Sequence, residues 1–132
     1  MIFIDSGIWI AAEAPADQYH ERASTLFHEL HASGEHMVIT ESVLSEVVGF
    51  FARKGHFSGA RLACEKMLNV NALELLVPAP EECAEAARFV EKFRLTSFTD
   101  ALTMAVMESR GLRKLLSFDS DFDANKKIKR VF

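Results

Sequence analysis

The chain has 132 residues, 49% of them apolar and 26% charged, a balance that excludes a disordered protein and fits a single globular domain over residues 1–132. Its net charge of −4 does not by itself indicate a polyanionic partner. Every apolar run is far shorter than the ~18 residues of a membrane-spanning helix, and the first run ends at Asp5 without a basic leader, which argues against membrane insertion and against a signal peptide.

Apolar residues recur along the chain in two alternating patterns. The run 1–5 is short and almost continuously apolar, as in a buried strand, whereas 40–54 carries an apolar stripe at helical spacing. In chain order, the patterns predict strand 1–5, helix 6–14, helix 17–32, strand 36–39, helix 40–54, helix 57–70, strand 72–77, helix 80–93, helix 97–110, strand 113–118 and a fifth strand over 129–132. Strands separated by helices form a parallel sheet covered on both faces. The predicted fold class is therefore α/β: a three-layer α/β/α domain with a mainly parallel sheet of about five strands.

Four acidic residues occupy element ends or the border of an apolar helix face: Asp5, Glu46, Asp100 and Asp119. A parallel α/β domain gathers the carboxyl ends of its strands, and the helix starts beside them, along one edge of the sheet. Carboxylates brought together there repel one another unless a divalent cation compensates their charge. The placement of these acids therefore predicts a metal site.

Each acid also has an ordinary structural interpretation. Asp5 suits a turn or a helix N-cap, and Glu46 suits a solvated position with its stem over the core. Ser97 and Asp100 fit the capping-box pattern, although the acid there is usually Glu. Asp119 suits a turn after the fourth predicted strand. A capping carboxylate can also bind a metal ion, so these roles leave the four acids available as a set.

Other metal and cofactor sites are disfavoured by specific positions. A calcium loop that starts at Asp119 would need Gly and Glu where the chain has Ala124 and Arg130. His28 and His31 are three residues apart, whereas the zinc-protease motif needs four. The chain has no Gly-rich phosphate loop and no nucleophile elbow. A receiver-type signalling domain would need an acid at the end of the third strand, where 75–78 reads Leu-Leu-Val-Pro.

Basic residues are concentrated in two segments: Arg53, Lys54, His56 and Arg61, and then Lys126, Lys127, Lys129 and Arg130. Either segment could be a solvated face or a contact for a polyanion, and the sequence supports both interpretations. Cys64 and Cys83 lie inside predicted helices without the spacing of a disulfide or metal site, which is typical of small core residues in a reducing cytoplasm.

With its four acids in this order on an alternating α/β chain, the sequence resembles the PIN-domain nucleases, and among them the toxin subunits of VapC-type toxin–antitoxin pairs. The similarity extends over 2–122, nearly the whole chain. The stretches that carry it are Ile2-Phe3-Ile4-Asp5-Ser6, Asp17-Gln18-Tyr19-His20-Glu21-Arg22-Ala23, Thr40-Glu41-Ser42-Val43-Leu44-Ser45-Glu46-Val47, Phe98-Thr99-Asp100-Ala101 and Leu116-Ser117-Phe118-Asp119-Ser120-Asp121-Phe122. Each stretch is weakly specific alone, and their order and spacing together are more specific.

The resemblance implies a metal-dependent endoribonuclease that hydrolyses RNA phosphodiester bonds, acting as the toxin of a type II toxin–antitoxin pair. The residues that it assigns to metal binding and catalysis are Asp5, Glu46, Asp100 and Asp119. Ser6 and Ser117 match positions near the family's site, and Asp121 matches a less regular acid. The implied partners are RNA, a second copy of the chain in a homodimer and a small protein antitoxin. A stand-alone PIN nuclease and a catalytically silent PIN-like binding module are the alternatives.

Carboxylate ligands without cysteine or paired histidine favour Mg²⁺, with Mn²⁺ as a substitute. The candidate contacts for RNA phosphates are Arg53, Lys54, Lys126 and Lys127. The Met104 and Met107 side of the 97–110 helix and the region of Phe50 and Phe51 are expected to offer apolar surface to a second copy or to the antitoxin.

Overall fold

The computed structural model describes residues 1–132. Five parallel strands form one sheet in the order β3-β2-β1-β4-β5. The strands are β1 (Ile2–Ile4), β2 (Met37–Thr40), β3 (Leu73–Leu76), β4 (Lys114–Leu116) and β5 (Lys129–Arg130). The helices are α1 (Ser6–Glu13), α2 (His20–Ser33), α3 (Glu41–Arg53), α4 (Phe57–Leu68), α5 (Pro80–Phe93) and α6 (Phe98–Ser109), with a 3₁₀ helix, η1, at Ser120–Ala124. The predicted five-stranded parallel sheet is confirmed.

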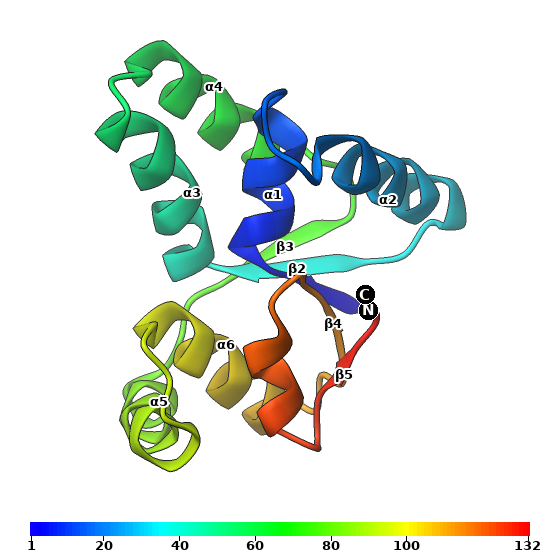
Figure 1. Ribbon diagram of the computed structural model, residues 1–132. Helices are drawn as coiled ribbons and strands as arrows, with labels where there is room; N and C mark the ends of the chain where they lie inside the picture. The colour runs from blue at the N-terminus through cyan, green and yellow to red at the C-terminus, as the bar shows by residue number, and fades with distance from the viewer.

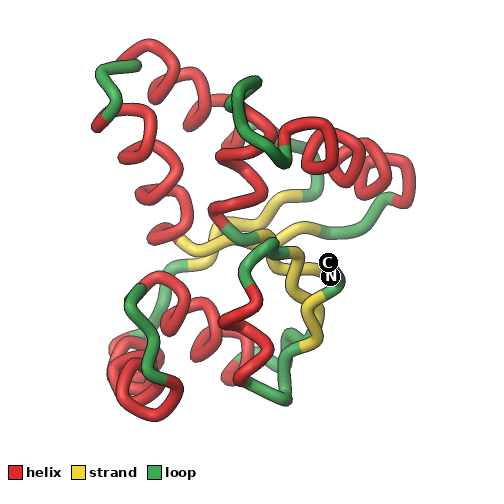
Figure 2. The backbone as a smooth tube through the Cα atoms, in the orientation of Figure 1, coloured by secondary structure: helices red, strands yellow, loops and turns green.

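Helices cover both faces of this sheet (Figure 1, Figure 2). Helices α1 to α4 lie on one side, and α5, α6 and η1 lie on the other, so the three layers follow the predicted α/β/α arrangement. Strands β1 and β2, in the interior of the sheet, are buried along their whole length. A strand covered on both faces has no solvated side, which explains why the Ile-Phe-Ile of β1 shows no polar alternation.

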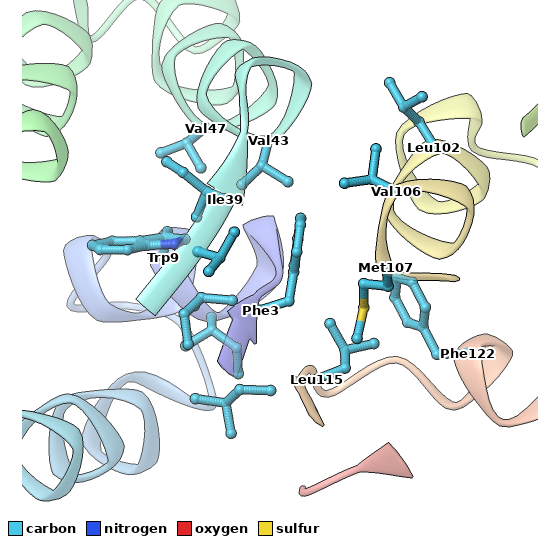
Figure 3. Close-up of a cluster of buried hydrophobic side chains, with 14 of the residues drawn as sticks. Phe3, Trp9, Ile39, Val43, Val47, Leu102, Val106, Met107, Leu115 and Phe122 are labelled. Carbon is cyan, nitrogen blue, oxygen red and sulfur yellow. The ribbon is translucent and has the colours of Figure 1, made fainter. Parts of the chain in front are cut away.

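The hydrophobic core has a part on each side of the sheet (Figure 3). On one side, Trp9 of α1 lies with Val43 and Val47 of α3. On the other side, Met107 of α6 faces Phe122 of η1. All five side chains are buried, and burial of one such side chain stabilises the fold by roughly 1.5–3 kcal/mol. The core therefore fixes α3, α6 and η1 against the sheet.

Helix α2 begins three residues later than the predicted helix 17–32. Asp17 Oδ1 accepts a hydrogen bond from the backbone N–H of Tyr19 at 2.8 Å, and the N–H of His20 donates to the carbonyl of Asp17 at 3.1 Å. Asp favours this kind of turn over a helix interior because its short side chain competes for backbone N–H groups. The helix ends at Ser33, one residue beyond the predicted end, and Gly34 caps it with a φ of 65°.

Helix α6 does not offer the apolar surface expected of its methionine side. Met104 and Met107 are both 0% exposed, because the helix is packed between the sheet and α5. Phe51 is also buried, and Phe50 is half-buried. The expectation that the side of Met104 and Met107 forms a contact for another protein is wrong: a helix that is apolar nearly all round is buried here within the chain itself.

Cys64 on α4 and Cys83 on α5 are free and half-buried. None of the helices combines the length and the apolar character that crossing a membrane requires.

Candidate functional site

The strand order reverses at β1, because the chain places β2 and β3 on one side of it and β4 and β5 on the other. In open α/β sheets such a reversal opens a crevice at the carboxyl ends of the strands, where ligands usually bind. Asp5 directly follows β1, and Ser117 directly follows β4. The pairing of Ile4 with Leu116 places Asp5 and Ser117 side by side at this point.

Two serine hydroxyls connect the acids at the crevice. Ser117 Oγ donates to Asp5 Oδ2 at 2.7 Å and accepts the backbone N–H of Asp119 at 3.0 Å. The backbone N–H of Ser6 donates to Asp5 Oδ1 at 2.7 Å, and Ser6 Oγ donates to Glu46 Oε2 at 2.7 Å. Asp5, Glu46 and Asp119 therefore belong to one hydrogen-bond network, with the buried Asp5 at its centre.

Glu46 reaches the network from the border of the buried face of α3. Thr40, the last residue of β2, caps this helix, since its Oγ1 accepts the N–H of Val43 at 3.4 Å. Val43 and Val47 are fully buried and fix the rotation of the helix about its axis. Glu46 lies between them in sequence and is half-buried, so its stem covers the core while its carboxylate meets Ser6.

Asp100 lies in the first turn of α6. Ser97 Oγ accepts the backbone N–H of Asp100 at 3.2 Å, which is one half of the predicted capping box. The carboxylate of Asp100 is half-buried and lines the same pocket as Asp5. A helix N-terminus favours a negative charge nearby, which partly offsets the crowding of acids.

Asp119 immediately precedes the 3₁₀ helix η1 and caps it. Its Oδ1 accepts the backbone N–H of Asp121 at 2.8 Å, and the fully buried Phe122 fixes the segment to the core. Asp121 contributes this N–H, but its side chain is exposed and does not line the pocket. The structure thus places Asp119 at the site and the carboxylate of Asp121 outside it.

The four predicted acids line one open pocket of about 550 Å³. The other residues around it are Ser6, Gly7, Ile10, Asp17, Gln18, Tyr19, Thr96, Ser97 and Phe118. The loop before α2, with Asp17 and Tyr19, was not predicted to reach the site. The sequence signal for it was the similarity over 17–23, a stretch that helical periodicity alone assigned to the beginning of a helix.

The crowding of acids favours protonated forms. Burial raises the pKa of Asp5 to about 6, although hydrogen bonds from Ser117 and Ser6 act in the opposite direction. The pKa of Asp100 is raised to about 7, mainly by burial and then by the charges of the three other acids. Such shifts show that negative charge is held here at a cost that a bound cation would relieve.

The residues fit a hydrated hard cation better than a fully enclosed one. No group of three or more His, Cys, Asp or Glu side chains is close enough together to hold one ion directly. The donors at the pocket are oxygens, and Mg²⁺ usually keeps several waters while it binds one or two protein carboxylates. One or two of the acids would therefore bind such an ion, and the others would contact its waters.

The structure places the basic candidates outside the pocket. Lys127 is exposed and forms an ion pair with Glu108, and Lys126 is exposed beside it. Arg53 and Lys54 are exposed at the end of α3, and neither takes part in an ion pair. Of these four candidates, Lys127 alone takes part in an ion pair.

The family model described as PIN domain matches residues 2–128. The chain is 32% identical over 126 residues to the 23S rRNA-specific endonuclease VapC20 of Mycobacterium tuberculosis (strain H37Rv), an alignment that covers 94% of this chain and 93% of the relative. The crystal structure of M. tuberculosis VapC20, described as a sarcin-ricin loop cleaving toxin, superposes with a TM-score of 0.80 and covers 94% of both chains. The residues paired by that superposition are 25% identical. VapBC2 of Rickettsia felis, bound to a DNA fragment from its promoter, shares the fold with a TM-score of 0.72, 15% identity, and coverage of 97% of this chain and 96% of the other.

Proposed function

Because the chain belongs to the PIN-domain family, we propose that it is an endoribonuclease of the VapC toxin type, which hydrolyses RNA phosphodiester bonds with a divalent cation. The observation that carries this proposal is the convergence of acids from four separate segments on one pocket at the carboxyl edge of the sheet. Oxygen ligands favour Mg²⁺, with Mn²⁺ as a substitute.

Each side chain has a distinct task in this proposal. Asp5 is held in one orientation by hydrogen bonds to both of its oxygens, and Ser6 holds Glu46 beside it. Asp100 and Asp119, on the wall of the pocket, accept hydrogen bonds that orient the attacking water. When bound, a divalent cation lowers the pKa of a water and neutralises charge on the phosphate.

Removing the central carboxylate tests the proposal. We expect Asp5→Asn, which preserves shape, to reduce the cleavage of single-stranded RNA with Mg²⁺ by roughly 10²-fold or more, because the anchor for metal and water is lost. Asp121→Asn, at an exposed acid outside the pocket, is the matched control and should change the rate less than about twofold. Cleavage by Asp5→Asn at the wild-type rate would contradict the assignment. A wild-type protein that cleaves no RNA with either cation would favour a silent binding module.

The biological setting belongs to the same proposal. The relatives, an rRNA-specific endonuclease and a loop-cleaving toxin, support a toxin that acts on RNA. We propose that it belongs to a type II pair, is inhibited by a small protein antitoxin and acts in the cytoplasm. We propose a homodimer as its assembly, and light scattering at micromolar concentration measures this directly, with a monomer counting against it. A stand-alone nuclease would cleave RNA equally well but have no antitoxin.

A further inference from the structure

Three aromatic rings form a row beside the acidic residues. The rings of Tyr19 and Phe118 are stacked, with centroids 4.4 Å apart and planes 21° from parallel. Phe118 in turn meets the ring of Phe132 edge-on at 5.2 Å. The guanidinium of Arg22 lies 4.6 Å from the centroid of the Phe132 ring, at the end of the row. The rings are therefore supported by one another and by a cation, not free to rotate independently.

The row begins inside the proposed catalytic pocket. Tyr19 and Phe118 line the same space of about 550 Å³ as Asp5 and Asp100. Phe118 immediately precedes Asp119 in the chain, so the position of its ring is tied to that acid. Tyr19 is fixed from the other side, because its backbone N–H donates to Asp17 Oδ1 at 2.8 Å. A pocket of this size accommodates a ligand of small-molecule dimensions, such as one nucleotide.

Electrostatic attraction does not explain how RNA would settle in this pocket. No Lys or Arg is among its lining residues, and five of them are acids that repel phosphates: Asp5, Asp17, Glu46, Asp100 and Asp119. Tyr19 nevertheless remains 42% exposed, although one face of its ring is covered by Phe118. Single-stranded nucleic acids bind to such platforms because every base has a π-face that can stack on an aromatic ring.

We propose that Tyr19, supported by Phe118, is a stacking platform for the RNA base next to the phosphate on which the acids act. The proposal rests on the nuclease function proposed above. Tyr19 is a positioning residue in this scheme: its ring holds the base, and through the base it holds the adjacent phosphate over the acids. Stacking tolerates any base, so the platform contributes binding and register more than sequence preference.

The chain has a single tyrosine, which makes the platform directly observable. Protein labelled with 3-fluorotyrosine gives one ¹⁹F resonance, and an overlying base should shift it upfield through its ring current. The probe is a mixed-sequence single-stranded RNA, added with Mg²⁺ to labelled Asp100→Asn protein so that the strand stays intact. A ribose-phosphate strand of equal length that lacks bases should leave the resonance in place. An unmoved resonance with saturating RNA, or an equal shift with the baseless strand, overturns the proposal.

Substitutions give a second, independent measurement. Tyr19→Ala should weaken RNA binding and raise KM roughly tenfold, whereas Tyr19→Phe should retain wild-type values because the ring is kept. Phe57→Ala is the control, since Phe57 is 73% exposed and lines a different pocket. Equal effects of Tyr19→Ala and Phe57→Ala on RNA binding, or weaker binding by Tyr19→Phe, contradict stacking.

If Tyr19→Ala fails to fold, the ¹⁹F measurement still tests the platform. RNA cleavage by wild type without a ¹⁹F shift rejects the platform alone, and a shift without cleavage rejects the nuclease function alone.

Discussion

At the scale of single residues, the site consists of carboxylates that the fold keeps buried and close together despite their mutual repulsion. The pKa of Asp5 is raised to about 6 by burial, and that of Asp100 to about 7 by burial and by its acidic neighbours. Both values lie above those of the unfolded chain, so the folded protein binds more protons between about pH 4 and 7. Its stability without metal therefore falls as pH rises through this window. For the buried Asp5, ionisation lowers the stability of the metal-free fold at neutral pH by on the order of 3 kcal/mol.

Neutralising one of these acids should make the metal-free protein more stable. We expect Asp100→Asn to raise the free energy of unfolding at pH 8 by about 1–2 kcal/mol, a value reduced to allow for solvent around this half-buried group. Near pH 4 the gain should disappear, because Asp100 is then protonated in the folded wild type. Urea unfolding in EDTA at both pH values measures this. Asp121→Asn is the control and should gain nothing. A loss of stability at pH 8 would mean that the Asp100 carboxylate makes a favourable contact instead.

The positions of the acids could be predicted from sequence, whereas their connections could not. Asp5 and Asp119 follow buried strands, and Glu46 falls at the border of an apolar stripe, all of which the pattern of residues shows. The bond from Ser117 to Asp5 joins residues 112 positions apart and depends on the register of β1 against β4. Nothing local in the sequence determines that register. The serines were placed near the site by family resemblance alone.

At the scale of secondary structure, Glu82 connects the start of α5 to the end of α6. Its carboxylate accepts the N–H of Ala79 at 2.8 Å and binds Arg110 through Nε at 2.9 Å and Nη2 at 2.8 Å. The hydrogen bonds from Arg110 are the largest cause of the lowered pKa of Glu82, which is about 2. Because α6 begins with the turn that carries Asp100, this clamp at the opposite end of the helix supports the site indirectly.

Loss of the Glu82 charge should therefore destabilise the fold. We expect Glu82→Gln to lower the free energy of unfolding by about 2 kcal/mol at pH 7, less than the pKa shift implies because Arg110 is partly solvated. The lowered pKa contributes stability above about pH 4.5 that is lost as pH falls towards 2. The difference from wild type should thus shrink at pH 3. Glu85→Gln removes an exposed pair with Arg88 and should cost less than about 0.5 kcal/mol. Equal costs in urea unfolding would contradict the clamp.

Local signals predicted α5 and α6 well, and predicted η1 and β5, which depend on distant contacts, less accurately. Pro80 starts α5, and Ser97 caps α6, as expected. The 3₁₀ helix η1 was predicted only as a turn, because what stabilises it is the burial of Phe122 against α6. The fifth strand has two residues of the predicted four, since it pairs with β4 alone at the edge of the sheet. Edge strands receive little support from the pattern of apolar residues.

At the scale of the whole molecule, alternation of strands and helices was sufficient to predict a layered α/β fold. The order β3-β2-β1-β4-β5 was not predicted, because periodicity carries no information on which strands are neighbours. That order places the reversal at β1 and hence determines where the acids meet. The overall charge of −4 is likewise less informative than its distribution, since the pocket is acidic and the free cations lie outside it.

This distribution of charge determines how RNA binding should depend on salt. Of the two basic segments, the later one is partly compensated: Lys127 pairs with Glu108, and Arg130 binds Asp123. Lys126 and Lys129 form no ion pair. Arg53 and Lys54 have no such partner. The Arg53 guanidinium lies over Gly49, where a Cβ would come within 2.8 Å of Nη1, so it extends back along α3 towards the end that carries the site. Phosphates that leave the pocket along α3 would meet these two cations first.

We therefore expect the affinity for RNA to depend only weakly on salt concentration, and this dependence to arise from Arg53 and Lys54. With two phosphate contacts to a single strand, log K against log salt should have a slope of about −1.4. Arg53→Ala and Lys54→Ala should each reduce its magnitude by ~0.7, because each removes one contact. Lys127→Ala, which deletes a cation already paired with Glu108, should leave the slope unchanged. Fluorescence anisotropy of labelled RNA at 50–300 mM salt, about the range in which phosphate contacts weaken, measures these slopes. A steeper slope that responds to Lys127→Ala would place the RNA backbone on the opposite side of the pocket, along η1 and β5.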